Sequence, residues 1–357
     1  MNKPLVIIRF RQSILVLSAL ILMTPSTLVA IQPSTSIFPT QINIFHPDVF
    51  PGPFTKSTSN PVLNTGTSPS WDEMGVYSPS VLWLNGTYHM WFSGTDTSFT
   101  SAIGYATSAN GTNWTKLVTN PVLTIGSPGT WEATSVGFAS VIPDGGGFKM
   151  WYTGTSGSIR RVGYATSPDG ITWTKYPGNP VLDVGAIGDW DASRVSNPTV
   201  TKVGSTYHMW YSSSISPAGG IGHATSPDGI DWTKDSGNPV IPGGSGTWDD
   251  TLFAPFVLHD GSMFQMWYTG CNPAQEICQI DYARSLDGST WTKRGIVLTM
   301  GSSGDFDSGL AGYPTVMMGV PYFRMWYTGS GSEELYRIGL ATAVRLETEL
   351  FLPMITK

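Results

Sequence analysis

The sequence predicts an all-β fold, a five-bladed β-propeller with four antiparallel strands in each blade. A Met-Trp dipeptide recurs at intervals of 60, 59, 57 and 59 residues, each time between an apolar run and a segment similar to "VGYATSPDG". The chain also contains 41 Gly, 26 Pro and 14 Trp but only 12% charged residues, a composition typical of many short strands joined by turns. Tandem copies of one unit indicate a repeat architecture. The dipeptides begin at Met90, Met150, Met209, Met266 and Met325.

Each unit divides into four predicted strands. In the first unit these are 79–84, 88–94, 103–108 and a fourth strand that begins at 114–116 and continues to 120–123. The turns between them have suitable chemistry, because Asn-Gly and Asp-Gly form tight hairpins and Ser-Pro-Asp-Gly supplies a fixed φ followed by a positive one. Asn-Gly or Asp-Gly joins strands one and two at 85–86 and 260–261, and Ser-Pro-Asp-Gly joins strands three and four at 167–170 and 226–229.

The segment 54–63, "FTKSTSNPVL", matches the fourth-strand segment 173–182, "WTKYPGNPVL", although it precedes the first unit. The last unit has no fourth strand of its own. An unpaired strand edge is a liability, so we expect 54–63 to complete the last blade and close the ring. The predicted propeller therefore spans 54–345, and 346–357 is a tail to which no function is assigned.

Residues 1–30 have the layout of a secretory signal peptide. A basic start is followed by the apolar run 13–23 and by small residues that end at Ala30. The run is too short to span a bilayer comfortably, and a retained membrane anchor is the alternative. We expect a secreted protein, extracellular or periplasmic, with 31–53 as a linker and no membrane association after cleavage.

Charge and cysteine content limit the partners. The net charge is −6, and the 19 Lys and Arg are scattered singly, which excludes the basic surface that a nucleic acid or an anionic membrane requires. Cys271 and Cys278 are the only cysteines. In an oxidising compartment they can form a local disulfide, whereas a metal site would need further ligands that the neighbouring sequence lacks. We expect a monomer without a cofactor.

The motifs "FKMWYTG" at 148–154 and "VGYATSPDGITWTK" at 162–175 resemble those of the five-bladed glycoside hydrolase superfamily, which includes arabinanases, family 43 enzymes, levansucrases and invertases. The resemblance covers 54–345 and implies a carbohydrate partner. Some members of the superfamily hold a central calcium, for which no motif is present here. The "SPDGITW" turn also resembles a shortened sialidase Asp-box, but sialidase propellers have six blades.

We expect the site in the central funnel, on the face where the long and variable loops gather. The resembled hydrolases use two carboxylates and often place an acid before a proline at the start of an innermost strand. This chain departs from that pattern, so those acids cannot be carried over. The residues at the corresponding positions are Ser78, Phe138, Asn197, Ala254 and Tyr313.

An acid does follow an aromatic residue slightly upstream in every unit, and this repetition favours a structural role. The pairs are Trp71-Asp72, Trp131-Glu132, Trp190-Asp191, Trp248-Asp249 and Phe306-Asp307. Two further acids, Glu73 and Asp250, break the symmetry. Together with Asp72 and Asp249 they are the candidate catalytic carboxylates, because adjacent acids can raise one another's pKa. The alternative is that Glu73 and Asp250 are solvated loop residues.

Aromatic and polar residues around the funnel are candidates for sugar binding, by stacking and hydrogen bonding. Lining of a narrow channel is the alternative for the aromatic ones. The candidates are Tyr77, Phe138, Arg194, Asn197, Phe253 and Tyr313. Two function classes follow: a secreted glycoside hydrolase with atypical carboxylates, and a non-catalytic propeller that binds carbohydrate or another surface partner.

Overall fold

The computed structural model describes residues 52–213, 219–244, 249–319, 322–333 and 335–344. Every regular element in these ranges is a β-strand, and no helix there is long and apolar enough to cross a membrane. The predicted signal peptide, nearly all of the predicted linker and the predicted tail lie outside the described residues.

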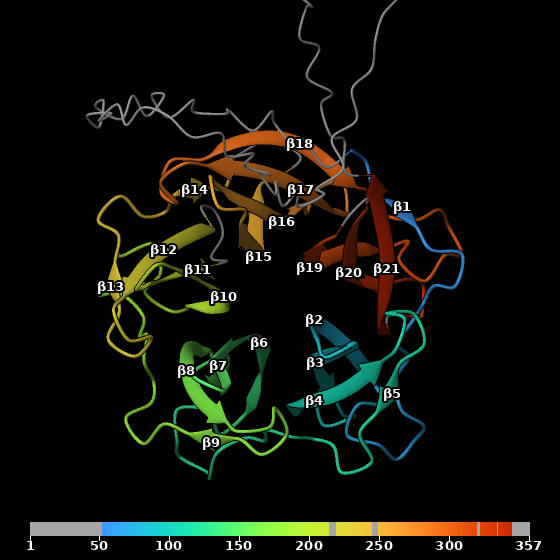
Figure 1. Ribbon diagram of the computed structural model, residues 1–357, viewed down its shortest axis with the longest axis horizontal. Helices are drawn as coiled ribbons and strands as arrows, with labels where there is room; N and C mark the ends of the chain where they lie inside the picture. The colour runs from blue at the N-terminus through green and yellow to red at the C-terminus, as the bar shows by residue number, and fades with distance from the viewer. Residues whose placement is uncertain (1–51, 214–218, 245–248, 320–321, 334, 345–357) are drawn as a thin grey trace, which may run out of the picture. The chain divides into compact units, whose positions relative to one another are not determined.

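The strands form four-stranded antiparallel sets in which each strand pairs with the next along the chain. In Figure 1 these sets surround a common centre, with the first strand of each set, β2, β6, β10, β15 or β19, nearest to it. The first three sets contain β2 (Gly75–Leu84), β3 (Thr87–Thr95), β4 (Ser101–Ser108), β5 (Thr115–Lys116), β6 (Ser135–Asp144), β7 (Gly147–Ser156), β8 (Ile159–Ser167), β9 (Thr174–Lys175), β10 (Ser196–Val203), β11 (Thr206–Ser213), β12 (Gly220–Ser226) and β13 (Thr233–Lys234). The remaining strands are β14 (Ile241–Pro242), which pairs with β12, and β15 (Thr251–His259), β16 (Phe264–Asn272), β17 (Ile277–Ser285), β18 (Thr292–Leu298), β19 (Leu310–Met318), β20 (Tyr322–Ser330) and β21 (Tyr336–Val344).

The N-terminal segment completes the last set, as expected. Strand β1 (Thr55–Lys56) pairs with β21 through Thr55–Thr342 and Lys56–Ala341. The Asn60 side chain accepts a hydrogen bond from the Leu340 N–H and donates one to its carbonyl, at 2.7 and 3.0 Å. Asn120 makes the same pair of bonds with Tyr105 in the first set. The segment therefore takes the place of a fourth strand.

The number of blades stays a prediction. A single parallel pair, Gly75 with Tyr336, joins β2 to β21, so that the first and last sets form one eight-stranded sheet. What the structure shows is an all-β fold of four-stranded antiparallel sets.

The fourth strand of the first set differs from the expectation, whereas β18 in the β15–β18 set is continuous. Instead of one strand from 114 to 123, β5 pairs over Thr115 and Lys116 only, and a second contact follows as an isolated bridge between Leu123 and Ile103. Between them lies a cis peptide bond before Pro121. Because proline has no N–H, it cannot continue the ladder. The Asn120 side chain bonds the backbone of Tyr105 in its place.

The repeated tryptophans pack between sets, as their repetition indicates. Trp91 is fully buried and donates its indole N–H to the Gly170 carbonyl of the next set, at 2.7 Å. The same bond joins Trp151 to Gly229, Trp210 to Gly288 and Trp326 to Gly111. Buried indole N–H groups of this kind stabilise the contact only when they find an acceptor.

The predicted disulfide is present. Cys271 on β16 and Cys278 on β17 are register partners and are bonded to each other, with their Cα atoms 4.2 Å apart. The bridge fixes the hairpin loop 273–276 between these two strands.

Candidate funnel at the centre of the sets

The first strand of each set has a bulge where it reaches the centre. The first residue of the bulge is left-handed in every set, with φ between 50° and 54°, which is uncommon for residues other than glycine. Its backbone N–H donates to a serine or threonine hydroxyl on the second strand of the preceding set. The bonds run from Ser78 to Thr328, Phe138 to Ser93, Asn197 to Thr153, Ala254 to Ser212 and Tyr313 to Thr269, at 2.8 to 3.0 Å.

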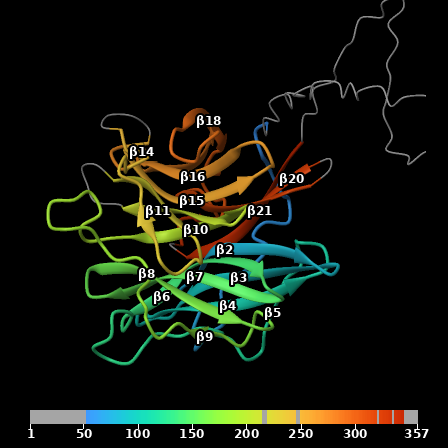
Figure 2. The same cartoon turned by 60° about the vertical axis from the view of Figure 1, so that its left-hand side comes forward.

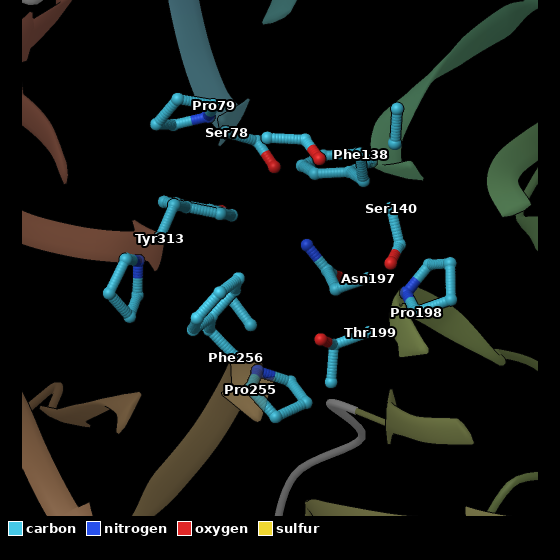
Figure 3. Close-up of a pocket in the computed structure, with 14 residues that line it drawn as sticks. Ser78, Pro79, Phe138, Ser140, Asn197, Pro198, Thr199, Pro255, Phe256 and Tyr313 are labelled. Carbon is cyan, nitrogen blue, oxygen red and sulfur yellow. The ribbon is translucent and has the colours of Figure 1, made fainter. Parts of the chain in front are cut away.

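These bonds direct the left-handed residues toward a small central cavity (Figure 3). Its volume is about 30 Å³, room for a water molecule or two but not for a sugar ring. Hydroxyl groups of Ser80, Ser140 and Thr199 and the ring of Phe256 also line it. The cavity is therefore the floor of any binding site on this axis.

Asn197 carries an unused donor at this floor. Its side chain is only 8% exposed, and its amide nitrogen has no hydrogen-bond partner. Figure 3 shows that nitrogen pointing into the cavity. A buried N–H without a partner costs about 1–3 kcal/mol, so the position suits an acceptor supplied by a ligand or by water.

Four of the predicted aromatic residues come together around the floor. The rings of Phe138 and Tyr313 stack at 5.9 Å with an interplanar angle of 23°, Tyr77 lies 5.5 Å from Phe138, and Phe253 lies 5.3 Å from Tyr313. Tyr336, which the sequence did not point to, packs on Tyr77 at 5.7 Å. The five rings thus form one continuous aromatic surface.

Two arginines lie beside this surface. Arg194, a predicted site residue, immediately precedes the stretch that leads to Asn197, and its backbone forms an isolated parallel bridge with Arg160. The Arg160 guanidinium lies 5.9 Å from the centre of the Phe138 ring. Sequence reasoning missed Arg160, which occupies the position of Ser101 in the first set and of Tyr336 in the last; this departure within the repeat was the available signal.

The repeated acids are held in ion pairs within their own sets. Asp72 is buried and accepts hydrogen bonds from Lys116 and from the Ser70 hydroxyl, both at 2.5 Å. Asp249 is also buried and is paired with Lys293. The other pairs are Glu132 with Lys175, Asp191 with Lys234, and Asp307 with Lys56. This arrangement supports the structural role of the repeated acids over a catalytic role for Asp72 and Asp249.

Glu73 and Asp250 are partly exposed and belong to sets that are not consecutive along the chain. Glu73 precedes β2 and Asp250 precedes β15, and the two sets stay apart in both Figure 1 and Figure 2. Hydrogen bonds from the Ser68 and Thr97 side chains lower the pKa of the Glu73 carboxyl, and partial desolvation opposes them. A lowered pKa suits a base or a nucleophile but not the proton-donating acid of a hydrolase.

Besides Glu73 and Asp250, the carboxylate of Asp281 on β17 also departs from the repeat. It is buried, and burial raises the pKa of its carboxyl although Tyr268 donates to it at 2.8 Å and the Tyr282 N–H at 2.6 Å. In the neighbouring β10–β13 set the matching tyrosine, Tyr211, instead donates to the repeated acid Asp191. Asp281 therefore takes over a structural bond rather than facing the cavity.

The cavity lining does not fit the calcium ion that some members of the resembled superfamily hold. Calcium in proteins is bound by six to eight oxygen atoms that usually include carboxylates. The residues that line the cavity carry hydroxyl, amide, aromatic and apolar side chains, and none of them is acidic. Across the described ranges, no group of three or more His, Cys, Asp and Glu residues could hold a metal ion.

Known sequences resemble this chain over part or most of its length. No family model matches it. An uncharacterised protein of Mycobacterium tuberculosis (strain H37Rv) is 27% identical over 278 residues, which cover 73% of this chain and 90% of that protein. A β-1,2-mannobiose phosphorylase of Thermoanaerobacter sp. (strain X514) is 31% identical over 111 residues, 27% of this chain and 36% of that enzyme.

Solved structures are similar over most of the chain. A glycosyl hydrolase from Bacteroides ovatus aligns with a TM-score of 0.69 at 18% identity, covering 83% of this chain and 95% of its own. A family 117 glycoside hydrolase from Zobellia galactanivorans gives 0.62 at 17%, covering 85% and 93%. A structure from glycoside hydrolase family 130 aligns with a TM-score of 0.65 at 17% identity, covering 84% of this chain and 98% of its own. That family of mannoside phosphorylases is described as containing hydrolases that target β-1,2-mannosidic linkages. These likenesses do not single out arabinanases or family 43, and what they show is the fold of a glycoside hydrolase-like β-propeller.

Proposed function

We propose that this chain is an exported, five-bladed propeller that binds extracellular carbohydrate in its central funnel. The observation that carries the proposal is the aromatic surface of Tyr77, Phe138, Phe253, Tyr313 and Tyr336 beside the unpaired Asn197 donor. Stacking rings with a few fixed hydrogen-bonding groups are the usual means by which proteins hold a sugar. The similarity to propellers described as glycoside hydrolases and to a mannobiose phosphorylase supports the same ligand class.

The assignment of five blades rests on the order of the sets. The sets that begin with β2, β6, β10 and β15 each supply four consecutive strands, and β19, β20 and β21 are completed by β1. The eight-stranded sheet then consists of two neighbouring blades that are joined by the parallel backbone pair of Gly75 and Tyr336.

Binding without efficient hydrolysis is the form of the function that the geometry favours. A glycoside hydrolase needs two carboxylates on either side of the scissile bond, one of them with a raised pKa. The five left-handed residues at the centre are not acidic, Asp72 and Asp249 are buried in ion pairs, and the pKa of Glu73 is lowered.

Hydrolysis remains the second candidate, because Glu73 and Asp250 are partly exposed acids that only two sets possess. In that case Glu73 would act as the base or nucleophile, in keeping with its lowered pKa, and Asp250 as the acid.

A glycan panel measured for both binding and reducing-end release tests the two candidates. Phe253→Ala and Asn197→Ala are expected to weaken binding at least about tenfold, since each removes a stacking face or a fixed donor. Trp83→Ala is the matched control, because Trp83 is 45% exposed at the far end of β2 and packs on Tyr88 instead. If Trp83→Ala abolishes binding and Phe253→Ala does not, the funnel is the wrong site. If the parent releases sugar, and Glu73→Gln and Asp250→Asn lose this release but still bind the glycan, the protein is an enzyme instead.

Export can be tested separately. Expression of the full chain in a bacterial host, followed by N-terminal sequencing of the protein outside the cytoplasm, is expected to give a start just after Ala30. A full-length product that stays in the membrane fraction would support the retained anchor.

A further inference from the structure

The position of the two arginines is set by the backbone at the junction between two sets. Arg160 is the second residue of β8 and bonds the segment before β10 twice, through its N–H to the Ser193 carbonyl at 3.3 Å and through its carbonyl to the Val195 N–H at 3.1 Å. Arg194 lies between these two residues and bridges Arg160. At the matching junction between the last and first sets the pair is Tyr336 and Gly75, which carries no charge.

The Arg160 guanidinium lies at the aromatic surface, and the charges of both arginines act on it. Arg160 lies over Phe138, whose ring stacks on Tyr313. Burial raises the pKa of the Tyr313 hydroxyl, and the positive charges of Arg160 and Arg194 act in the opposite direction, so both charges are felt at that hydroxyl. Burial and the like charge of Arg160 lower the pKa of Arg194.

Arg160 carries its charge beside a second, partly buried arginine, and like charges placed together favour the approach of an anion. Most other cations of the structure have an acidic partner: Lys56, Lys116, Lys175, Lys234 and Lys293 pair with the repeated acids, and Arg161 pairs with Asp183. Within the described part of the chain Arg160 has no such ion pair. An arginine that lies over an aromatic ring keeps its N–H groups available for an oxyanion.

We propose that Arg160 and Arg194 bind the oxyanion of an acidic sugar, a carboxylate or a sulfate ester, while the aromatic surface and the Asn197 amide hold its ring. This inference rests on the proposed carbohydrate binding and narrows it to anionic glycans. The flat, forked guanidinium group matches the geometry of carboxylate and sulfate oxygens, and such charge-assisted bonds are roughly twice as strong as neutral ones.

The test is calorimetric titration of the full protein with three oligosaccharide series: neutral, uronate-containing and sulfated. A uronate oligosaccharide whose carboxyl groups have been reduced to alcohols serves as the control on the ligand side. We expect the acidic ligand to bind, its reduced form to bind about 10- to 100-fold more weakly, and its affinity to fall with added salt. The uronate and sulfated series identify which oxyanion is recognised.

Arg160→Met and Arg194→Met are expected to remove the preference for the acidic ligand while leaving weak binding of the neutral form. Arg161→Met is the matched control, because Arg161 is adjacent in β8, points to the other face of the strand and pairs with the exposed Asp183. Thermal unfolding of each variant within a few degrees of the parent shows that the fold is kept.

The outcomes separate the two levels of the proposal. If neutral and acidic glycans bind equally and Arg160→Met changes nothing, but Phe253→Ala still weakens binding, the anion preference is wrong and the carbohydrate site stands. If sodium sulfate alone binds as tightly as the sulfated sugar, the ring contributes nothing and the inference fails. If no glycan of any series binds, the proposed function itself is wrong.

Discussion

The ammonium nitrogen of Lys56 lies 2.6 Å from Oδ2 of Asp307, although the two residues come from opposite ends of the described chain. Lys116 and Asp72 form the same pair within the first set, where both residues belong to one continuous stretch of chain. The N-terminal segment therefore supplies both the backbone pairing and the buried ion pair of the strand that the last set lacks.

Lys56→Met should destabilise the protein. Asp307 is only 1% exposed, and without Lys56 its carboxylate keeps the hydroxyl bond from Tyr327 but loses its ammonium partner. Because Lys56 itself is partly exposed, we expect a loss of about 2 kcal/mol in the free energy of unfolding, below the cost of breaking a fully buried pair. Denaturant unfolding measures it, and Arg337→Met, which breaks an exposed pair with Glu333, should cost about 0.5 kcal/mol or less. Equal effects of the two variants would contradict the closing role of Lys56.

Thr153→Val should destabilise more than Thr153→Ser. The fully buried Thr153 hydroxyl accepts the N–H of Asn197, and valine fills the same volume but leaves that N–H without an acceptor, at a cost of about 1–3 kcal/mol. Serine keeps the hydroxyl, as Ser93 and Ser212 do in two other sets, and loses only a methyl group. Chemical unfolding curves for the two variants decide the matter, and a valine variant as stable as the serine variant would show that the hydroxyl bonds contribute little.

The pair His208–His223 should make the protein less stable in mild acid. Nδ1 of His208 lies 3.1 Å from Nε2 of His223. Burial is the main cause that lowers the pKa of His208 to about 4, and the charges of His223 and His259 act in the same direction. Burial also lowers the pKa of His223, although Asp235 opposes it and Ser289 lies within reach of the same ring nitrogen. The folded state thus binds fewer protons than the unfolded chain, so this stability is present above pH 6.5 and is lost as the pH falls toward 4.

The double variant His208→Gln/His223→Tyr recreates the Gln265–Tyr282 pair of the β15–β18 set, whose hydroxyl donates at 2.9 Å. Between pH 6.5 and 4.5, the free energy of unfolding should fall less for this variant than for the parent, by on the order of 1–2 kcal/mol. Unfolding free energies at several pH values test this, and parallel curves for parent and variant would rule the histidine pair out as the cause.

Asp281→Asn should stabilise the protein at neutral pH by about 1 kcal/mol. Burial raises the pKa of this carboxyl above its unfolded value of 3.8. Its contribution to the stability of the folded state is therefore complete below pH 3.8 and is lost as the pH rises through the pKa of the folded state. The gain of the amide should therefore shrink as the pH approaches 4. Asp249→Asn is the contrasting variant, because it removes the partner of Lys293 and should destabilise at pH 7. Melting temperatures at pH 7 and pH 4 distinguish these expectations, and a neutral or negative effect of Asp281→Asn at pH 7 would count against them.

Much of the fold follows from the repeat. The Met-Trp spacing predicted the strand order, the match between 54–63 and 173–182 predicted the pairing of β1 with β21, and the spacing of Cys271 and Cys278 predicted their disulfide. The continuous fourth strand was wrong for the first set, because periodicity does not reveal that Asn120 bonds the backbone where Pro121 cannot, but it was correct for β18.

The funnel was only partly predictable. Tyr77 and Phe253 share one position of the repeat, and Phe138 and Tyr313 share the next, just before the predicted first strand, so their convergence could be expected. Arg160 and Tyr336 lie at the start of third strands, where the sequence does not show that the chain approaches the neighbouring first strand. The hydroxyl bonds from one set to the next were also hidden, since they depend on the left-handed backbone at the bulge.

That bulge has a consequence for how such a protein can acquire new specificity. A serine, a phenylalanine, an asparagine, an alanine and a tyrosine all adopt the same φ, and each is held by a backbone bond that does not involve its own side chain. Replacement of one of these five side chains therefore alters the chemistry met by a ligand while the surrounding architecture stays the same. Recognition and folding are separable at the axis, and diversification there should be tolerated far better than at the buried tryptophans.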